Sequence, residues 1–122
     1  RVAARRAIRE RYMKGLADLP YIHFMPERPD TRMNAWLSIC IFSGDSPVTP
    51  ENIRLALEKY NIESRPAWNP MHAQPVFRDV QFIGKGVSAH IFKHGLCLPS
   101  GSAMNTHTQD NIISVIYETC RQ

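Results

Sequence analysis

The most chemically informative part of the sequence is a proline-rich stretch that begins at Arg65. Arg65 offers a planar guanidinium that can bind a carboxylate or a phosphate through two hydrogen bonds. Trp68 and Phe77 offer flat faces for a sugar or a base, and His72 and Gln74 offer neutral polar contacts at near-alternate positions of an extended chain. These five residues are therefore the candidate ligand-binding residues, and together they suit a polar ligand that contains a ring.

The same stretch, residues 65–84, also has a purely structural interpretation. Its prolines exclude a central strand or helix and stiffen the backbone. They are Pro66, Pro70 and Pro75. An irregular segment of this length inside a small domain is uncommon and is usually functional or disordered, and its aromatic residues argue against disorder. Trp68, Met71 and Phe77 could instead cover the sheet, and composition leaves both interpretations open.

Two histidines have the spacing of metal ligands on a helix. His90 and His94 lie four residues apart in a segment with helical character, and Cys97 follows three residues later. The residue after His90 is Ile91, so the glutamate base of an HExxH motif is missing. The alternative is a pair of surface histidines near a helix C-terminus, where positive charge is favourable. We therefore expect no metal site.

Candidate nucleophiles are equally weak. Ser100 and Ser102 flank Gly101 after a predicted strand, which could form a small anion-binding nest or a plain turn. Lys85 lies in a loop between two glycines, but nothing around it implies the burial or second cation that an amine nucleophile needs. We nominate no catalytic and no cofactor-binding residue in this chain.

Composition and charge narrow the class of protein. The 122 residues are 43% hydrophobic and 21% charged, which fits one small globular domain. The net charge of +4 comes from residues 1–18, which hold six basic and two acidic residues. These arginines have no interleaved aromatic or amide side chains, so a solvated face or pairing with an acidic neighbour is favoured over nucleic-acid binding. No apolar run could span a bilayer, and three cysteines without a CxxC motif indicate a reducing cytoplasm.

Hydrophobic periodicity and capping signals predict the elements that position these residues. The predicted helices are 2–19, 50–60 (Thr49 as N-cap, Asn61 left-handed at the end), 88–94 (closed by Gly95) and 109–120 (Thr108 as N-cap). The predicted strands are 21–25, 34–42 (covered on both sides), 62–64 and 96–98. This order predicts an α+β domain over residues 1–122, with a small, mostly antiparallel sheet and helices packed on one face.

The run Ser64-Arg-Pro-x-Trp-x-Pro-Met-His-x-Gln-Pro-Val-Phe77 resembles the C-terminal small domain of DegT/DnrJ sugar aminotransferases, which are fold-type I pyridoxal-phosphate (PLP) enzymes. The resemblance covers essentially the whole chain. Asn34-Ala-Trp-Leu37 is similar to a strand of that domain, residues 50–61 to its helix, and Gly95-Leu-Cys-Leu-Pro-Ser-Gly101 to its late G-L-x-L-P-S-G segment. The loop is most similar to that of members acting on UDP-linked 4-keto-6-deoxy-N-acetylhexosamines.

The resemblance implies transfer of an amino group from glutamate to a nucleotide-linked 4-keto-6-deoxy sugar in surface-glycan biosynthesis, by a homodimer. The family's Schiff-base lysine lies in a large N-terminal domain that this sequence does not contain. We therefore expect a fragment that neither holds PLP nor turns over alone. By the same resemblance, Arg65 would meet the anionic part of the ligand and His72 a sugar or phosphate. A non-catalytic α+β module that binds a protein or ligand is the alternative.

Overall fold

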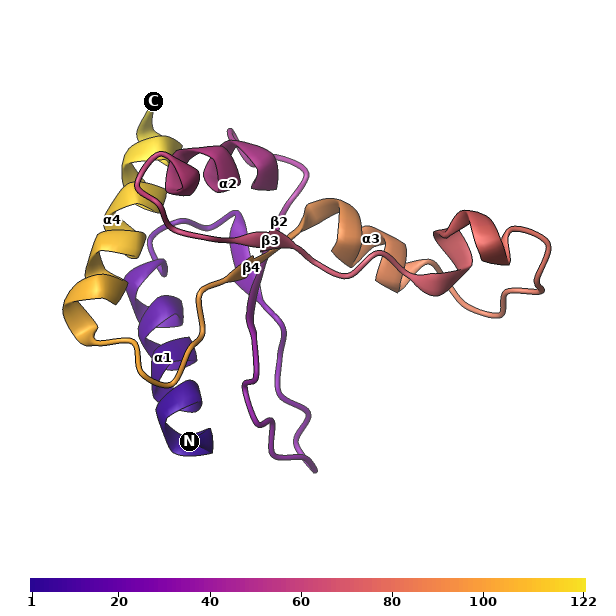
Figure 1. Cartoon of the computed structure of the whole chain (residues 1–122), viewed down its shortest axis with the longest axis horizontal. Coiled ribbons are helices and arrows are strands. Elements are labelled where there is room, and N and C mark those ends of the chain that lie inside the picture. The colour runs from indigo at the N-terminus through magenta and orange to yellow at the C-terminus, as the bar shows by residue number, and fades with distance from the viewer.

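The four helices and four strands alternate irregularly along the chain. A computed structural model describes residues 1–122 (Figure 1). The helices are α1 (Val2–Gly15), α2 (Pro50–Glu58), α3 (Val87–His94) and α4 (Thr106–Arg121), and the strands are β1 (Ile22–Phe24), β2 (Ser38–Phe42), β3 (Arg65–Pro66) and β4 (Gly95–Leu98). Two 3-10 turns, η1 (Met71–Ala73) and η2 (Pro75–Phe77), interrupt the long loop. No helix is long and apolar enough to cross a membrane.

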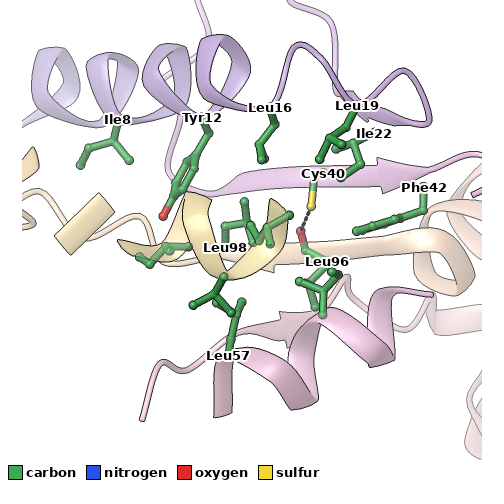
Figure 2. Close-up of a cluster of buried hydrophobic side chains, with 14 residues drawn as sticks. Ile8, Tyr12, Leu16, Leu19, Ile22, Cys40, Phe42, Leu57, Leu96 and Leu98 are labelled. Atoms are coloured by element: carbon green, nitrogen blue, oxygen red, sulfur yellow. Dashed lines mark hydrogen bonds between the residues drawn. The ribbon is translucent and has the colours of Figure 1, made fainter. Parts of the chain in front are cut away.

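The strands form one antiparallel sheet in the order β1-β2-β4-β3. The central pair is set by Cys40 of β2 opposite Leu96 of β4, and the Cys40 thiol donates a hydrogen bond to the Leu96 carbonyl at 3.4 Å (Figure 2). Burial raises the pKa of the Cys40 thiol to about 12, which keeps it protonated. The predicted fold class, an antiparallel sheet with helices on one face, is confirmed.

The core lies between this sheet and helices α1, α2 and α4. It is a cluster of 14 buried residues, shown in Figure 2. Its helical members are Ile8, Tyr12 and Leu16 near α1, Ile53 and Leu57 of α2, and Ile112, Val115 and Ile116 of α4. Tyr12 is fully buried and its hydroxyl donates to the Pro99 carbonyl at 2.9 Å. Burial raises the pKa of Tyr12 well above its ordinary value, so the phenol stays neutral.

Helix α3 and the loop before it take no part in this core. No residue of α3, η1 or η2 is buried. Figure 1 shows α3 and the two 3-10 turns extending from the sheet, away from α1 and α4. We call residues 68–94 the arm. Its exposed large apolar side chains are Trp68, Met71, Val76, Val80, Phe82, Ile83, Val87 and Phe92.

The helix ends follow the sequence signals in part. The Thr49 hydroxyl accepts from the Asn52 N–H at 3.2 Å, while the Asn52 side chain accepts from the Thr49 N–H at 2.8 Å. This capping box, with Pro50 in the first turn, confirms the predicted start of α2. Asn61 has the predicted left-handed backbone, with φ of 57°, but α2 ends at Glu58, two residues earlier than predicted, with Lys59 as its right-handed C-cap.

Two predicted helix boundaries were wrong by three residues or more. Helix α4 begins at Thr106 because Asn105 is its N-cap, and its side chain accepts from the N–H of Thr108. Helix α1 ends at Gly15, and the chain continues through turns in which Leu16 and Leu19 stay buried. Helix α3 ends at His94, as predicted, and its C-cap Gly95 has an extended backbone and begins β4 directly.

The strand predictions were too long or displaced. Strand β2 begins at Ser38 because Ala35, three residues earlier, has a left-handed backbone with φ of 51°. Only one face of β2 is fully buried, since Ile39 and Ile41 on the other face are half-buried. The third strand is Arg65–Pro66, not 62–64, and it forms the sheet edge, where a proline costs no ladder hydrogen bond.

Candidate functional site

The proline-rich loop leaves the sheet from its edge strand. Arg65 pairs with Cys97 and Pro66 with Leu96, and the Ala67 N–H donates to the Gly95 carbonyl at 3.2 Å. The start of the loop is therefore fixed by β4. This anchoring places Arg65 and Trp68 beside the turn that follows β4.

Arg65 and Trp68 line a cleft of about 520 Å³ at the edge of the sheet. The opposite wall is the turn after β4, with Ser100 and Gly101, and the start of α4, with Thr108. The Arg65 side chain is 75% exposed and is paired only with Glu63, its Nη2 lying 2.5 Å from Oε1. Such an exposed pair between near neighbours contributes little stability, so the guanidinium can exchange Glu63 for an anionic ligand.

Trp68 also borders a second cleft, of about 470 Å³. This cleft is mostly apolar and includes Trp36, Ile39 and Ile91. The rings of Trp36 and Trp68 meet edge to face, with centroids 5.9 Å apart and planes at 69°. Both rings remain more than half exposed. The arrangement can hold a planar or ring-shaped group between an aromatic wall and a cation.

The other three predicted site residues lie farther out along the arm. His72 stacks on Phe82, with ring centroids 3.7 Å apart and an interplanar angle of 21°. The Gln74 amide donates to the Asn69 carbonyl at 3.3 Å, within the same loop. Phe77 is half-buried in η2. None of His72, Gln74 and Phe77 lines either cleft, so their role in binding stays a prediction.

The Ser100 turn is held together by its own hydrogen bonds. The Ser100 hydroxyl accepts from the Ser38 N–H at 2.9 Å and donates to the Leu98 carbonyl at 2.8 Å. It is buried and ties the start of β2 to the end of β4. This use of the hydroxyl supports the turn interpretation over an anion nest. Two other buried hydroxyls, of Ser38 and Ser64, have no hydrogen-bond partner.

The histidine pair of α3 does not form a metal centre. The His90 and His94 rings lie 4.6 Å apart, but no group of three or more His, Cys, Asp or Glu side chains could hold an ion. Partial burial, reinforced by the nearby charges of His90 and Lys93, lowers the pKa of His94. Cys97 is buried in β4, and burial raises the pKa of its thiol.

The lysines of the chain lie away from the two clefts. Covalent capture of PLP needs a lysine amine, and no lysine lines either cleft. All four lysines of the chain are exposed. The side chains that line the clefts can contact a ligand, but they offer no amine for a Schiff base with PLP.

Sequence reasoning did not identify the partners of the arginines of α1. Arg6 binds both carboxylate oxygens of Glu27 at 2.9 Å, and Arg11 pairs with Asp110 of α4. Arg5 and Arg9 donate to backbone carbonyls of the segment that joins β1 to β2. The preference for pairing over nucleic-acid binding agrees with these contacts. No local signal identifies Glu27 as the partner, because 21 residues separate the two.

Comparisons with known proteins identify the family of the chain. The family model of the DegT/DnrJ/EryC1/StrS aminotransferases matches residues 1–117. The Bacillus subtilis (strain 168) protein EpsN, whose name describes a pyridoxal phosphate-dependent aminotransferase, is 38% identical over 120 residues, which are 95% of this chain and 30% of that protein.

Solved structures share the fold of the whole chain. A DegT DnrJ EryC1 StrS aminotransferase from Brucella abortus superposes with a TM-score of 0.82 at 21% identity, over 99% of this chain and 31% of its own. The PLP form of the sugar aminotransferase Spr1654 from Streptococcus pneumoniae gives a TM-score of 0.80 at 21% identity, over 98% of this chain and 31% of its own. The chain thus spans about a third of the relatives it matches. With 117 of its 122 residues matched, the chain belongs to the DegT/DnrJ/EryC1/StrS aminotransferase family.

Proposed function

We propose that this chain is the C-terminal small domain of a PLP-dependent aminotransferase. The enzyme would move an amino group from glutamate to the keto group of a nucleotide-linked 4-keto-6-deoxy sugar in surface-glycan biosynthesis. The observation that carries the proposal is the match of the family model to nearly the whole chain. The cofactor of that enzyme would supply the electron sink, and the residues of this chain would bind and orient the sugar nucleotide.

Arg65 and Trp68 are the residues of this domain best placed to meet the substrate. Arg65 presents an exposed guanidinium at the cleft, and its pair with Glu63 can be exchanged for a phosphate. Trp68 presents a ring face beside it, suited to a sugar or a nucleobase. Their shared anchoring on β4 lowers the entropy lost when the ligand binds.

The arm would complete the site with another part of the enzyme. Its apolar side chains are exposed, which is unusual for so many neighbours on one small domain. We infer that this surface packs against the large domain or the second subunit of a homodimer, and that His72, Gln74 and Phe77 meet the substrate there. Three free cysteines suit an enzyme of the cytoplasm.

The first test is the visible absorption of the complete enzyme before and after glutamate. Bound PLP gives a yellow protein, and glutamate bleaches it if it is the amino donor. A folded protein that stays colourless after incubation with PLP would refute the proposed function and would leave the alternative, a non-catalytic binding module, in its place.

The second test concerns the assigned residues. Arg65→Ala and His72→Ala should each lower kcat/KM for the keto-sugar nucleotide. Arg28→Ala is the matched control, because Arg28 is equally exposed and pairs with Asp30 two residues away, at 3.7 Å. Wild-type kcat/KM in both the Arg65 and His72 variants would refute the assignment of the loop to substrate binding.

A further inference from the structure

The segment between β1 and β2 is held from one side by helix α1. We call residues 25–37 the β1–β2 loop. Arg9 donates to the Met25 carbonyl at 2.5 Å, and Arg5 donates to the Trp36 carbonyl at 3.2 Å. These contacts secure the two ends of the loop. In Figure 1 the loop runs beyond the sheet beside the N-terminal part of α1.

A bidentate ion pair holds the middle of the loop. The Arg6 guanidinium donates to both carboxylate oxygens of Glu27 at 2.9 Å, and its Nη1 also donates to the Met33 carbonyl at 2.5 Å. The Met33 N–H in turn donates to Glu27. Arg6, Glu27 and Met33 therefore form a closed set of hydrogen bonds that joins α1 to both limbs of the loop. Both charged side chains are about one-quarter exposed, so water competes with them less than with the other ion pairs.

The loop ends on Trp36, whose backbone is fixed on both sides. The Trp36 N–H donates to the Asn34 side chain at 3.0 Å, and its carbonyl accepts from Arg5. Ala35, which lies between Asn34 and Trp36, is buried and has a left-handed backbone. With its backbone held in this way, the Trp36 ring stands edge-on to Trp68, which borders both clefts.

We infer that Arg6 and Glu27 are positioning residues for the substrate loop: they hold the β1–β2 loop against α1, so that Trp36 orients Trp68. This inference rests on the proposed function of Trp68. Neither residue lines the clefts, but both bind the backbone of Met33, which lines the second cleft, and they act through the stretch from Met33 to Trp36. Helix α1 is attached to the core independently, through Ile8 and Tyr12. Loss of the pair should therefore release the loop without unfolding the domain.

The test uses the two tryptophans of this chain as its reporter. Their edge-to-face contact should give a component of the near-ultraviolet circular dichroism spectrum that Trp36→Phe and Trp68→Phe each remove. Arg6→Gln and Glu27→Gln should lose most of this signal while keeping the far-ultraviolet spectrum. Arg6→Lys should lose it as well, because an ammonium cannot make the two parallel bonds of the guanidinium.

Arg11→Gln is the matched control. Arg11 lies on the same helix and also makes a bidentate pair, with Asp110, but this pair joins α1 to α4 and not to the loop. Its variant should keep the tryptophan signal. An unchanged signal in Arg6→Gln and Glu27→Gln would overturn the inference, and so would an equal loss in Arg11→Gln.

Kinetics of the complete enzyme separate this inference from the proposed function. Arg6→Gln should raise KM for the keto-sugar nucleotide about tenfold and change kcat less than twofold, since it loosens binding and not the reacting groups. Loss of the tryptophan signal in an enzyme with no activity toward any keto sugar would support the positioning of Trp36 and refute the proposed function. Loss of the signal with an unchanged KM would overturn the positioning role.

Discussion

Tyr12→Phe isolates one buried hydrogen bond between the ends of the chain. Tyr12 is fully buried, and its hydroxyl donates to the Pro99 carbonyl at 2.9 Å, across 87 residues of sequence. The substitution removes one oxygen and leaves the ring in place, so it opens almost no cavity. It also leaves the Pro99 carbonyl without this donor, which costs about 1–3 kcal/mol.

Thermal unfolding of the chain measures this cost. For a domain of this length, about 1 kcal/mol corresponds to a change of about 4 °C in Tm, so Tyr12→Phe should lower Tm by about 4–12 °C. Tyr60→Phe is the control, because Tyr60 is 61% exposed and its hydroxyl makes no hydrogen bond to the protein, so its Tm should stay within about 2 °C of the wild type. Equal Tm values for the two variants would refute the stabilising role of the hydrogen bond from Tyr12 to Pro99.

Alkaline pH provides an independent signature of the same burial. Burial raises the pKa of Tyr12 in the folded state above its unfolded value of 10.0. The folded state therefore keeps a proton that the unfolded state loses, and stability falls as pH rises above 10. Tyr12→Phe has no phenol at this position and lacks this loss. The difference in unfolding free energy between the wild type and Tyr12→Phe should therefore narrow by about 1.4 kcal/mol per pH unit above 10. A constant difference from pH 8 to pH 11 would contradict the burial of the phenol.

Three further predictions concern the cap, the core and the loop. Thr49→Ala should cost about 1 kcal/mol by removing the capping box with Asn52, measured by urea unfolding. Leu57→Ala should cost about 2–5 kcal/mol, whereas Leu55→Ala, at a position 43% exposed, should cost much less. The hydrogen bonds from its arginine partner lower the pKa of Glu27 from 4.5 to about 2. The contribution of ionised Glu27 to stability should therefore be complete above pH 4.5 and fall toward pH 2. The urea midpoint of Glu27→Gln should lie closer to that of the wild type at pH 3 than at pH 6.

Local signals in the sequence were sufficient where neighbouring residues decide the structure. Thr49 and Pro50 predicted the start of α2, and Asn61 has the predicted left-handed backbone in the turn after the helix, because caps and turns depend on residues within one turn. Alternating and helical periodicity predicted the α+β class for the same reason. Asn105 was missed as a cap because Thr108, a residue of the same capping class, follows three positions later.

Long-range contacts could not be predicted from the sequence. The apolar run from residue 34 predicted a strand, but the left-handed Ala35 and the pairing of Ser38 with Leu98 set its true start. Arg65 and Trp68, both predicted binding residues, line one cleft, whereas His72 stacks on Phe82. Stacking within the arm depends on which aromatic side chains meet, and spacing alone does not determine that.

The distribution of apolar side chains is the reason to propose that the arm is a contact surface and not a second core. The 14 residues of the core cluster include none from residues 68–94, so the domain is packed without the arm. The arm nevertheless exposes eight large apolar side chains. Exposed apolar side chains are common singly, but a run of this density on a projecting segment is typical of an interface. A sequence selected only to fold the sheet and its three helices would have no reason to keep such a run. The stacked His72 and Phe82 give this segment a defined shape before it meets a partner, which lowers the entropy cost of that contact.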